Sequence, residues 1–228
     1  MPPQRPDAIE ALKPHAPAPS EDGRQLGYAP APESQTRVAP PLAAGGKDFC
    51  SRLLASKNIV AHRVASIHHG ACGINTPVSV TAIVEDDGHQ IEMIPHPIMR
   101  CELASEVASW VIEDLAPRAQ KVGGKIARIH NAASYDCRTM NHRAHAKLSE
   151  HGKGNAIDMR DIEFESGKTV DFVGHGKDRP FIAAIRETAC ERFNTVLGPG
   201  SDGYHEDHVH VDLYARKHDL HICRWRLR

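Results

Sequence analysis

The spacing of apolar residues predicts two long helices in this chain. One covers residues 104–115 and is expected to end before Pro117, because proline lacks the N–H group that a helix interior needs. The other covers residues 181–193 and carries Cys190. A shorter helix bearing Cys50 is expected close to residue 48. The segments between these helices are predicted to contain the strands.

The strands are predicted from apolar residues that alternate with small or polar ones. Residues 77–83 alternate in this way, and Asp86, Asp87 and Gly88 then predict a turn. The order of elements favours an α+β domain with an antiparallel sheet and flanking helices. The remaining strands are expected at residues 126–129, 157–164 and 169–173 and, last in the chain, in the segment that carries His208 and His210.

The N-terminal part of the chain differs in composition from the rest. Residues 1–46 are rich in proline, alanine and charged residues and contain almost no large apolar side chains. Such a segment cannot bury enough surface to offset the entropy lost on ordering. We therefore predict a disordered tail over residues 1–46 and one folded domain over residues 47–228.

Charge and hydropathy exclude two classes of protein. The 228 residues carry a formal net charge of -1, whereas a general nucleic-acid binder usually carries a concentrated basic excess. No apolar stretch approaches the length of a transmembrane span, and the first residues lack the apolar core of a signal peptide. If the protein is exported, we expect either a leader removed from this sequence or a dedicated secretion system.

The six cysteines are dispersed and form no Cys-x-x-Cys pair. This distribution disfavours a cysteine zinc site and favours three disulfides, although fifteen pairings are possible. Disulfides would place the protein in an oxidising compartment such as the periplasm.

Two histidine-rich motifs carry the candidate chemistry. In the first, Gly152 and Gly154 allow a turn after His151, so that the carboxylate of Asp158 can return beside the imidazole. In the second, strand alternation places His208, His210 and Asp212 on one face. Two imidazoles and one carboxylate are the ligand set of a catalytic zinc site with an open position. Asp212 could orient an imidazole by a hydrogen bond.

These motifs resemble the extensin-like C-terminal domain family and, more distantly, the LAS metallopeptidases, which include D-Ala-D-Ala peptidases and penicillin-insensitive murein endopeptidases. The similarity covers roughly residues 49–224. The segments that carry it are Ala71–Ile74, Ser134–Arg138, Ser149–Asp158, Thr195–Pro199 and His205–Asp212.

The resemblance implies a LAS-type fold in which the sheet carries the metal ligands, and it implies a role for each residue. The Zn²⁺ ligands would be His151, Asp158 and His210. His208 would take the place of the catalytic imidazole, with His205 as a supporting site residue, and Arg138 would hold a carboxylate or the developing oxyanion.

Three of these roles have open alternatives. The general base could be His208, His205 or Asp207, since Asp207 lies three residues before the last ligand. His205 could instead cap a turn, and Arg138 could pair with a surface acid. The remaining histidines are expected to be ordinary surface or core residues.

The function implied is hydrolysis of amide bonds in peptidoglycan stem peptides or crosslinks by a periplasmic or otherwise exported zinc peptidase. D,D or L,D specificity, and endopeptidase or carboxypeptidase action, stay open. One rival is a zinc-containing module that binds cell wall without cleaving it. Another is an exported antibacterial effector with the same chemistry, for which an immunity or regulatory protein would be a partner.

Overall fold

The computed structural model describes the chain from residue 47 to residue 227. The predicted tail, residues 1–46, lies outside the described residues. The first element, α1 (Lys47–Ala55), is the short helix expected close to residue 48 and contains Cys50.

A ten-stranded sheet forms the centre of this domain, with the main strand order β1-β4-β5-β7-β8-β11-β10-β12. Strand β6 pairs with β4 and β9 pairs with β8, while β2 and β3 form a separate pair. The strands are β1 (Ile59–Arg63), β2 (Ile67–His69), β3 (Cys72–Ile74), β4 (Pro77–Val84), β5 (Gln90–Ile94), β6 (Ile98–Arg100), β7 (Ile126–Ala133), β8 (Ala156–Phe164), β9 (Thr169–Asp171), β10 (Thr195–Leu197), β11 (Val209–Asp212) and β12 (Ile222–Arg224).

The α+β class is confirmed, and the strands that carry Asp158 and His210 pair antiparallel, as predicted. Two pairs elsewhere in the sheet depart from the antiparallel arrangement. Strand β5 pairs parallel with β7, and β10 pairs parallel with β12. The chain between β5 and β7 includes β6 and a long helical segment, and such crossovers allow neighbouring strands to run in the same direction. The strand predicted to hold His208 and His210 is β11, which begins one residue later, at Val209. The prediction that it comes last was wrong, because β12 follows it and extends the sheet.

The first long helix continues beyond its predicted end. Helix α2 (Cys101–Trp110) runs into a π-helical turn, η1 (Val111–Leu115), and then into α3 (Ala116–Ala119). Pro117 lies in the first turn of α3. The π-helical turn interrupts the regular α-helical hydrogen-bond ladder directly before Pro117, which has no N–H group to donate to it. The π-helical turn thus lets the chain pass a residue that was expected to stop it.

The second long helix was predicted correctly and forms α4 (Arg179–Arg192). None of the described helices is long and apolar enough to cross a membrane. Four short 3₁₀ turns complete the described elements: η2 (Met140–His142), η3 (Glu150–Lys153), η4 (Gly176–Asp178) and η5 (Lys217–Asp219).

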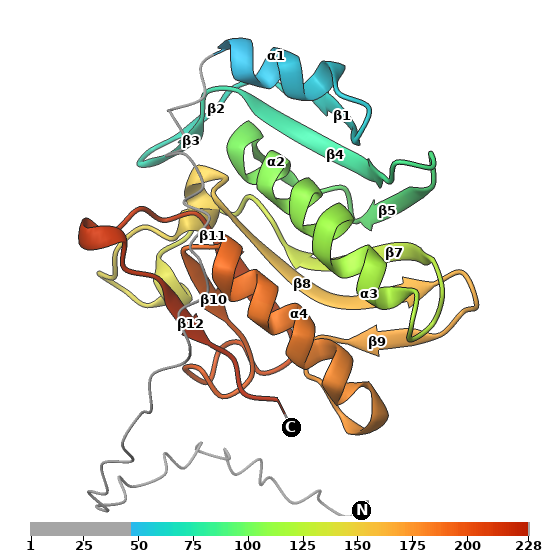
Figure 1. The fold of residues 1–228 in the computed structure, drawn as a ribbon. Coiled ribbons are helices and arrows are strands. Elements are labelled where there is room, and N and C mark those ends of the chain that lie inside the picture. The colour runs from blue at the N-terminus through green and yellow to red at the C-terminus, as the bar shows by residue number, and fades with distance from the viewer. Residues whose placement is uncertain (1–46, 228) are drawn as a thin grey trace, which may run out of the picture. The chain divides into compact units, whose positions relative to one another are not determined.

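The helices α2, α3 and α4 cover one face of the sheet (Figure 1), and the core lies between these two layers. Trp110 of α2 meets Phe193 edge-on at 5.7 Å and donates a hydrogen bond of 3.1 Å to Thr188 of α4. Each large apolar side chain buried in this way contributes about 1.5 to 3 kcal/mol. The opposite face of the sheet, here called the helix-free face, carries polar side chains.

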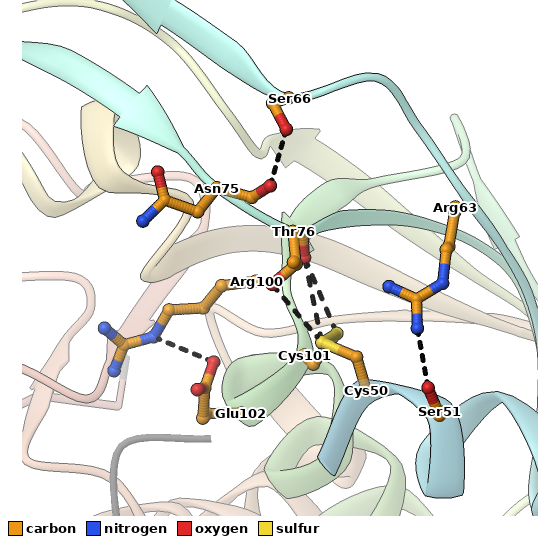
Figure 2. The surroundings of a disulfide bond; sticks show 9 residues. All are labelled: Cys50, Ser51, Arg63, Ser66, Asn75, Thr76, Arg100, Cys101 and Glu102. Atoms are coloured by element: carbon orange, nitrogen blue, oxygen red, sulfur yellow. Dashed lines mark hydrogen bonds and ion pairs between the residues drawn. A yellow bond between two sulfur atoms is a disulfide. The ribbon is translucent and has the colours of Figure 1, made fainter. Parts of the chain in front are cut away.

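Three disulfides join distant parts of the domain, as predicted: Cys50–Cys101, Cys72–Cys137 and Cys190–Cys223. The first ties α1 to α2, and Thr76 Oγ1 lies 3.4 Å from the sulfur of Cys50 (Figure 2). The second ties β3 to the segment that precedes η2, and the third ties α4 to β12. Such a set of bridges indicates an oxidising environment.

Reduction of these bridges is expected to lower the melting temperature by about 10 °C or more, since each contributes roughly 2 to 4 kcal/mol in a domain of this size. The check is calorimetry with and without reductant, together with thiol titration of the denatured protein. Titration should find no free thiol before reduction and six afterwards. Six free thiols before reduction would contradict the assignment.

Candidate metal centre

His151 reaches the helix-free face from the short turn η3. The Oγ of Ser149 accepts a hydrogen bond of 3.3 Å from the backbone N–H of His151 and caps this turn. Gly154 ends it in the left-handed region, at φ +60°. A side chain at Gly154 would collide with Ile74, so only glycine fits there. The chain can then enter β8 at once.

Asp158 and His210 face each other across two paired strands. Strand β8 pairs antiparallel with β11, and the register places His210 opposite Asp158. The alternate residues Ile157 and Val211 point into the apolar core. Because successive side chains of a strand point to opposite faces, Asp158 and His210 lie on the helix-free face. The alternation of β11 thus places His210 and Asp212 on one face, as predicted.

Three side-chain atoms converge at the cluster formed by His151, Asp158 and His210. His151 Nε2 lies 3.1 Å from His210 Nδ1 and 3.2 Å from Asp158 Oδ1. His210 Nδ1 lies 2.8 Å from the same carboxylate oxygen. The residues are 1%, 3% and 7% exposed respectively. This cluster could hold a metal ion.

The outer nitrogen of each imidazole has its own acceptor. His151 Nδ1 lies 2.6 Å from the carbonyl oxygen of Ser134, and His210 Nε2 lies 3.2 Å from Asp212 Oδ2. A neutral imidazole that donates outward through one nitrogen presents a lone pair on the other. Two such lone pairs and a carboxylate oxygen would then point at one position, an arrangement that could hold a cation. Outer acceptors of this kind are the usual supports of metal-binding histidines.

The electrostatics of the cluster favour positive charge beside Asp158. Burial opposes ionisation of Asp158, yet hydrogen bonds from His151 and His210 hold its pKa well below the ordinary range. Burial likewise opposes a charged His210, but Asp158 and Asp212 raise the pKa of His210 to about 9. A proton therefore sits in the cluster at neutral pH, and a bound metal would take its place.

His208 and His205 both lie beside the cluster. His208 immediately precedes β11, and its Nε2 lies 3.7 Å from Asp158 Oδ2 while its Nδ1 lies 2.8 Å from Asp207 Oδ1. The ring of His205 lies 5.2 Å from that of His208 and 5.5 Å from that of His210. Burial lowers the pKa of His205 despite its contact with Asp202. The structure thus brings both predicted histidines to the site.

Arg138 also lies at the cluster, with its side chain 18% exposed. Its Nη2 is 3.8 Å from Asp158 Oδ2, and its Nε is 2.9 Å from Asp136 Oδ2. The guanidinium of Arg138 therefore contacts a surface acid, Asp136, and also approaches Asp158 of the cluster.

Sequence reasoning missed several residues that support the site. The Ser134 carbonyl holds His151, and a main-chain group leaves no signal in a sequence. Asp202 accepts hydrogen bonds from His205, at 2.7 Å, and from Asn141, at 3.3 Å, and so links two segments across the site. The three-residue spacing between Asp202 and His205 was the only hint of this pair. Thr195 hydrogen-bonds the Asp212 carboxylate.

Asp212→Asn is expected to weaken metal binding roughly 10- to 100-fold, the usual cost of losing the carboxylate behind a histidine ligand. The measurement is competition for the metal with a coloured chelator. Asp207→Asn is the matched control, since the Asp207 side chain is 84% exposed and touches no ligand of the cluster among the described contacts. Equal affinity of the Asp212 variant and the unsubstituted protein would show that Asp212 does not orient His210.

The fold and the cluster together define a disulfide-linked α+β domain with a candidate metal centre on the helix-free face of its sheet. The profile of the family described as "Extensin-like protein C-terminus" matches residues 48–224. The chain therefore belongs to this family. Searches of curated proteins and of solved structures found no match.

Proposed function

We propose that the protein is a zinc-dependent hydrolase of amide bonds in peptidoglycan stem peptides or crosslinks. The observation that carries the proposal is the convergence of His151, Asp158 and His210, each imidazole being held from behind by its own acceptor. The resemblance of the two histidine motifs to the LAS metallopeptidases supplies the reaction and the substrate class.

The spacing of the three ligand atoms suits zinc. In a tetrahedral site with Zn–N and Zn–O distances near 2.0 to 2.2 Å, two ligand atoms lie about 3.3 to 3.5 Å apart. The separations of 3.1, 2.8 and 3.2 Å need only a small outward movement to reach this range. A zinc ion held there would polarise the scissile carbonyl and lower the pKa of water.

His208 has the position of a general acid and base. Its contact with Asp207 orients the ring, and its Nε2 faces the cluster without belonging to the converging triangle. In hydrolysis, water adds to the carbonyl carbon, the C–N bond breaks, and the amine leaves with an added proton. In this proposal His208 would accept a proton from the attacking water and donate it to the leaving amine.

Arg138 and His205 complete the proposed catalytic residues. The guanidinium of Arg138, beside Asp158, would stabilise negative charge that develops on the carbonyl oxygen. His205, which burial favours in its neutral form, would orient substrate or support His208. The three disulfides support a periplasmic or otherwise exported location, where peptidoglycan is accessible.

A direct test is to incubate the protein with purified peptidoglycan and to measure new free amino groups, which every amide hydrolysis must produce. The proposal expects amines to accumulate with zinc-loaded protein and to stay at background after treatment with chelator. Tight binding to peptidoglycan without any release of amines would identify a wall-binding module instead.

A further inference from the structure

A cavity opens beside the cluster of His151, Asp158 and His210. Its volume of about 370 Å³ is within the range of sites that bind small ligands. His151, His205 and His210 line it together with Tyr214 and Arg216 from the segment after β11. A molecule bound in this cavity can therefore contact the candidate metal centre and these later residues at once.

The basic side chains of the cavity differ in how they are neutralised. Arg138 pairs with Asp136, and Lys153 pairs with Glu150 at 2.6 Å. Among residues 49–227, neither the exposed Lys147 nor the less exposed Arg216 has a carboxylate within 4.0 Å. Arg216 differs from Lys147 in that neighbouring groups hold its guanidinium in place. Its charge is therefore available to an anionic ligand.

The guanidinium of Arg216 is fixed in place by neutral groups. Its Nη1 donates to the carbonyl oxygens of Asn194, at 2.9 Å, and Tyr214, at 3.4 Å, and its Nη2 donates to Thr195 Oγ1 at 2.7 Å. Its carbon lies 4.8 Å from the centre of the Tyr214 ring. Three of the five N–H donors of an arginine are thus used, so two remain for a ligand.

Arg216 is close to the candidate metal centre. Thr195, which it contacts, hydrogen-bonds the Asp212 carboxylate, and Asp212 in turn contacts His210 at 3.2 Å. A few hydrogen bonds therefore separate the guanidinium from a metal ligand. A short extended peptide, which advances about 3.3 to 3.6 Å per residue, can therefore reach both.

We propose that Arg216 binds a free carboxylate of the peptide substrate and thereby sets the scissile bond a few residues from that carboxylate. A planar guanidinium with two unused donors suits a carboxylate, which can accept two parallel hydrogen bonds. This inference rests on the proposed function and narrows it to peptides that carry a carboxylate near the cleaved bond. In stem peptides the carboxylate is either the C-terminal one or that of a side chain.

The test is calorimetric binding of three synthetic stem pentapeptides to the zinc-loaded protein. One is the free acid, one is amidated only at the C-terminus, and one is amidated only at its side-chain carboxylate. The free acid is expected to bind at least tenfold tighter than one of the two amides, and that amide identifies the carboxylate bound. Equal binding of all three would overturn the proposal.

Variants then assign the preference to Arg216. Arg216→Gln should reduce the ratio of acid to amide affinity to near one, with unchanged zinc content and a melting temperature only a few degrees lower, because the hydrogen bonds of Arg216 to Asn194 and Thr195 are lost. Lys147→Gln, which removes a charge from the same cavity, should keep most of the ratio. Arg216→Lys keeps the charge without the planar pair of donors and should give an intermediate ratio. An Arg216→Gln variant with the original ratio would exclude Arg216 as the receptor.

Failure of the peptidase proposal has a different outcome from failure of this one. A preference for the acid that depends on Arg216, without any cleavage, would retain the carboxylate site and reject the peptidase. Cleavage without any preference between acid and amides would retain the peptidase and reject the role of Arg216.

Discussion

Alanine at His151, Asp158 or His210 is expected to remove most of the bound zinc. Each residue supplies one of only three converging protein atoms, and a site with two ligands binds zinc far more weakly. Each is also almost fully buried, so water has little access to replace a lost ligand without rearrangement. The measurement is elemental analysis of the purified variants after dialysis against metal-free buffer.

The matched control is His68→Ala, because His68 is an exposed histidine on β2. This variant should retain the full zinc content of the unsubstituted protein. Full zinc occupancy in any one of the three cluster variants would remove that residue from the ligand set. Asp158→Asn is a further useful variant, since it keeps the size of the side chain and removes its charge.

His208→Ala is expected to lower the rate of peptidoglycan cleavage by about 100-fold or more, the usual scale for loss of a general acid or base. Zinc content and melting temperature should stay unchanged, because His208 Nε2 contacts Asp158 Oδ2 at 3.7 Å and not the oxygen at which the ligand atoms converge. The rate is measured with the zinc-loaded variant on purified muropeptides.

His205→Ala and Asp207→Asn distinguish the alternatives for this role. If His208 is the general base, both should lower the rate less than His208→Ala does. Near-normal turnover of His208→Ala would instead transfer the role to His205 or Asp207. Loss of zinc together with activity would make His208 a ligand.

The sequence predicted the main elements of the fold because they have clear periodicities. The expected helices over residues 104–115 and 181–193 and the expected strands over residues 157–164 and 169–173 are present, although their ends differ. The short strands β1, β2, β3, β5, β6, β10 and β12 were missed, because three to five residues give too little alternation to recognise. Parallel pairing of β5 with β7 was missed because it depends on the path of the intervening helix.

The three atoms of the candidate metal centre were predictable for a different reason. Asp158 and His210 lie at alternating positions of two strands, and the motifs around them specify which face they share. The groups that support the site were harder to predict from the sequence. The Ser134 carbonyl is a main-chain group, and the contacts of Thr195 and Arg216 arise only when β10 and the segment after β11 come together.

The most direct test of the central claim is mass spectrometry of purified muropeptides after incubation with the protein, with and without chelator. The account predicts products whose masses correspond to addition of one water at an amide bond of the stem peptide or crosslink. It also predicts that these products disappear with chelator and return when zinc is restored. Unchanged muropeptides with a fully zinc-loaded protein, or cleavage that persists in chelator, would contradict it.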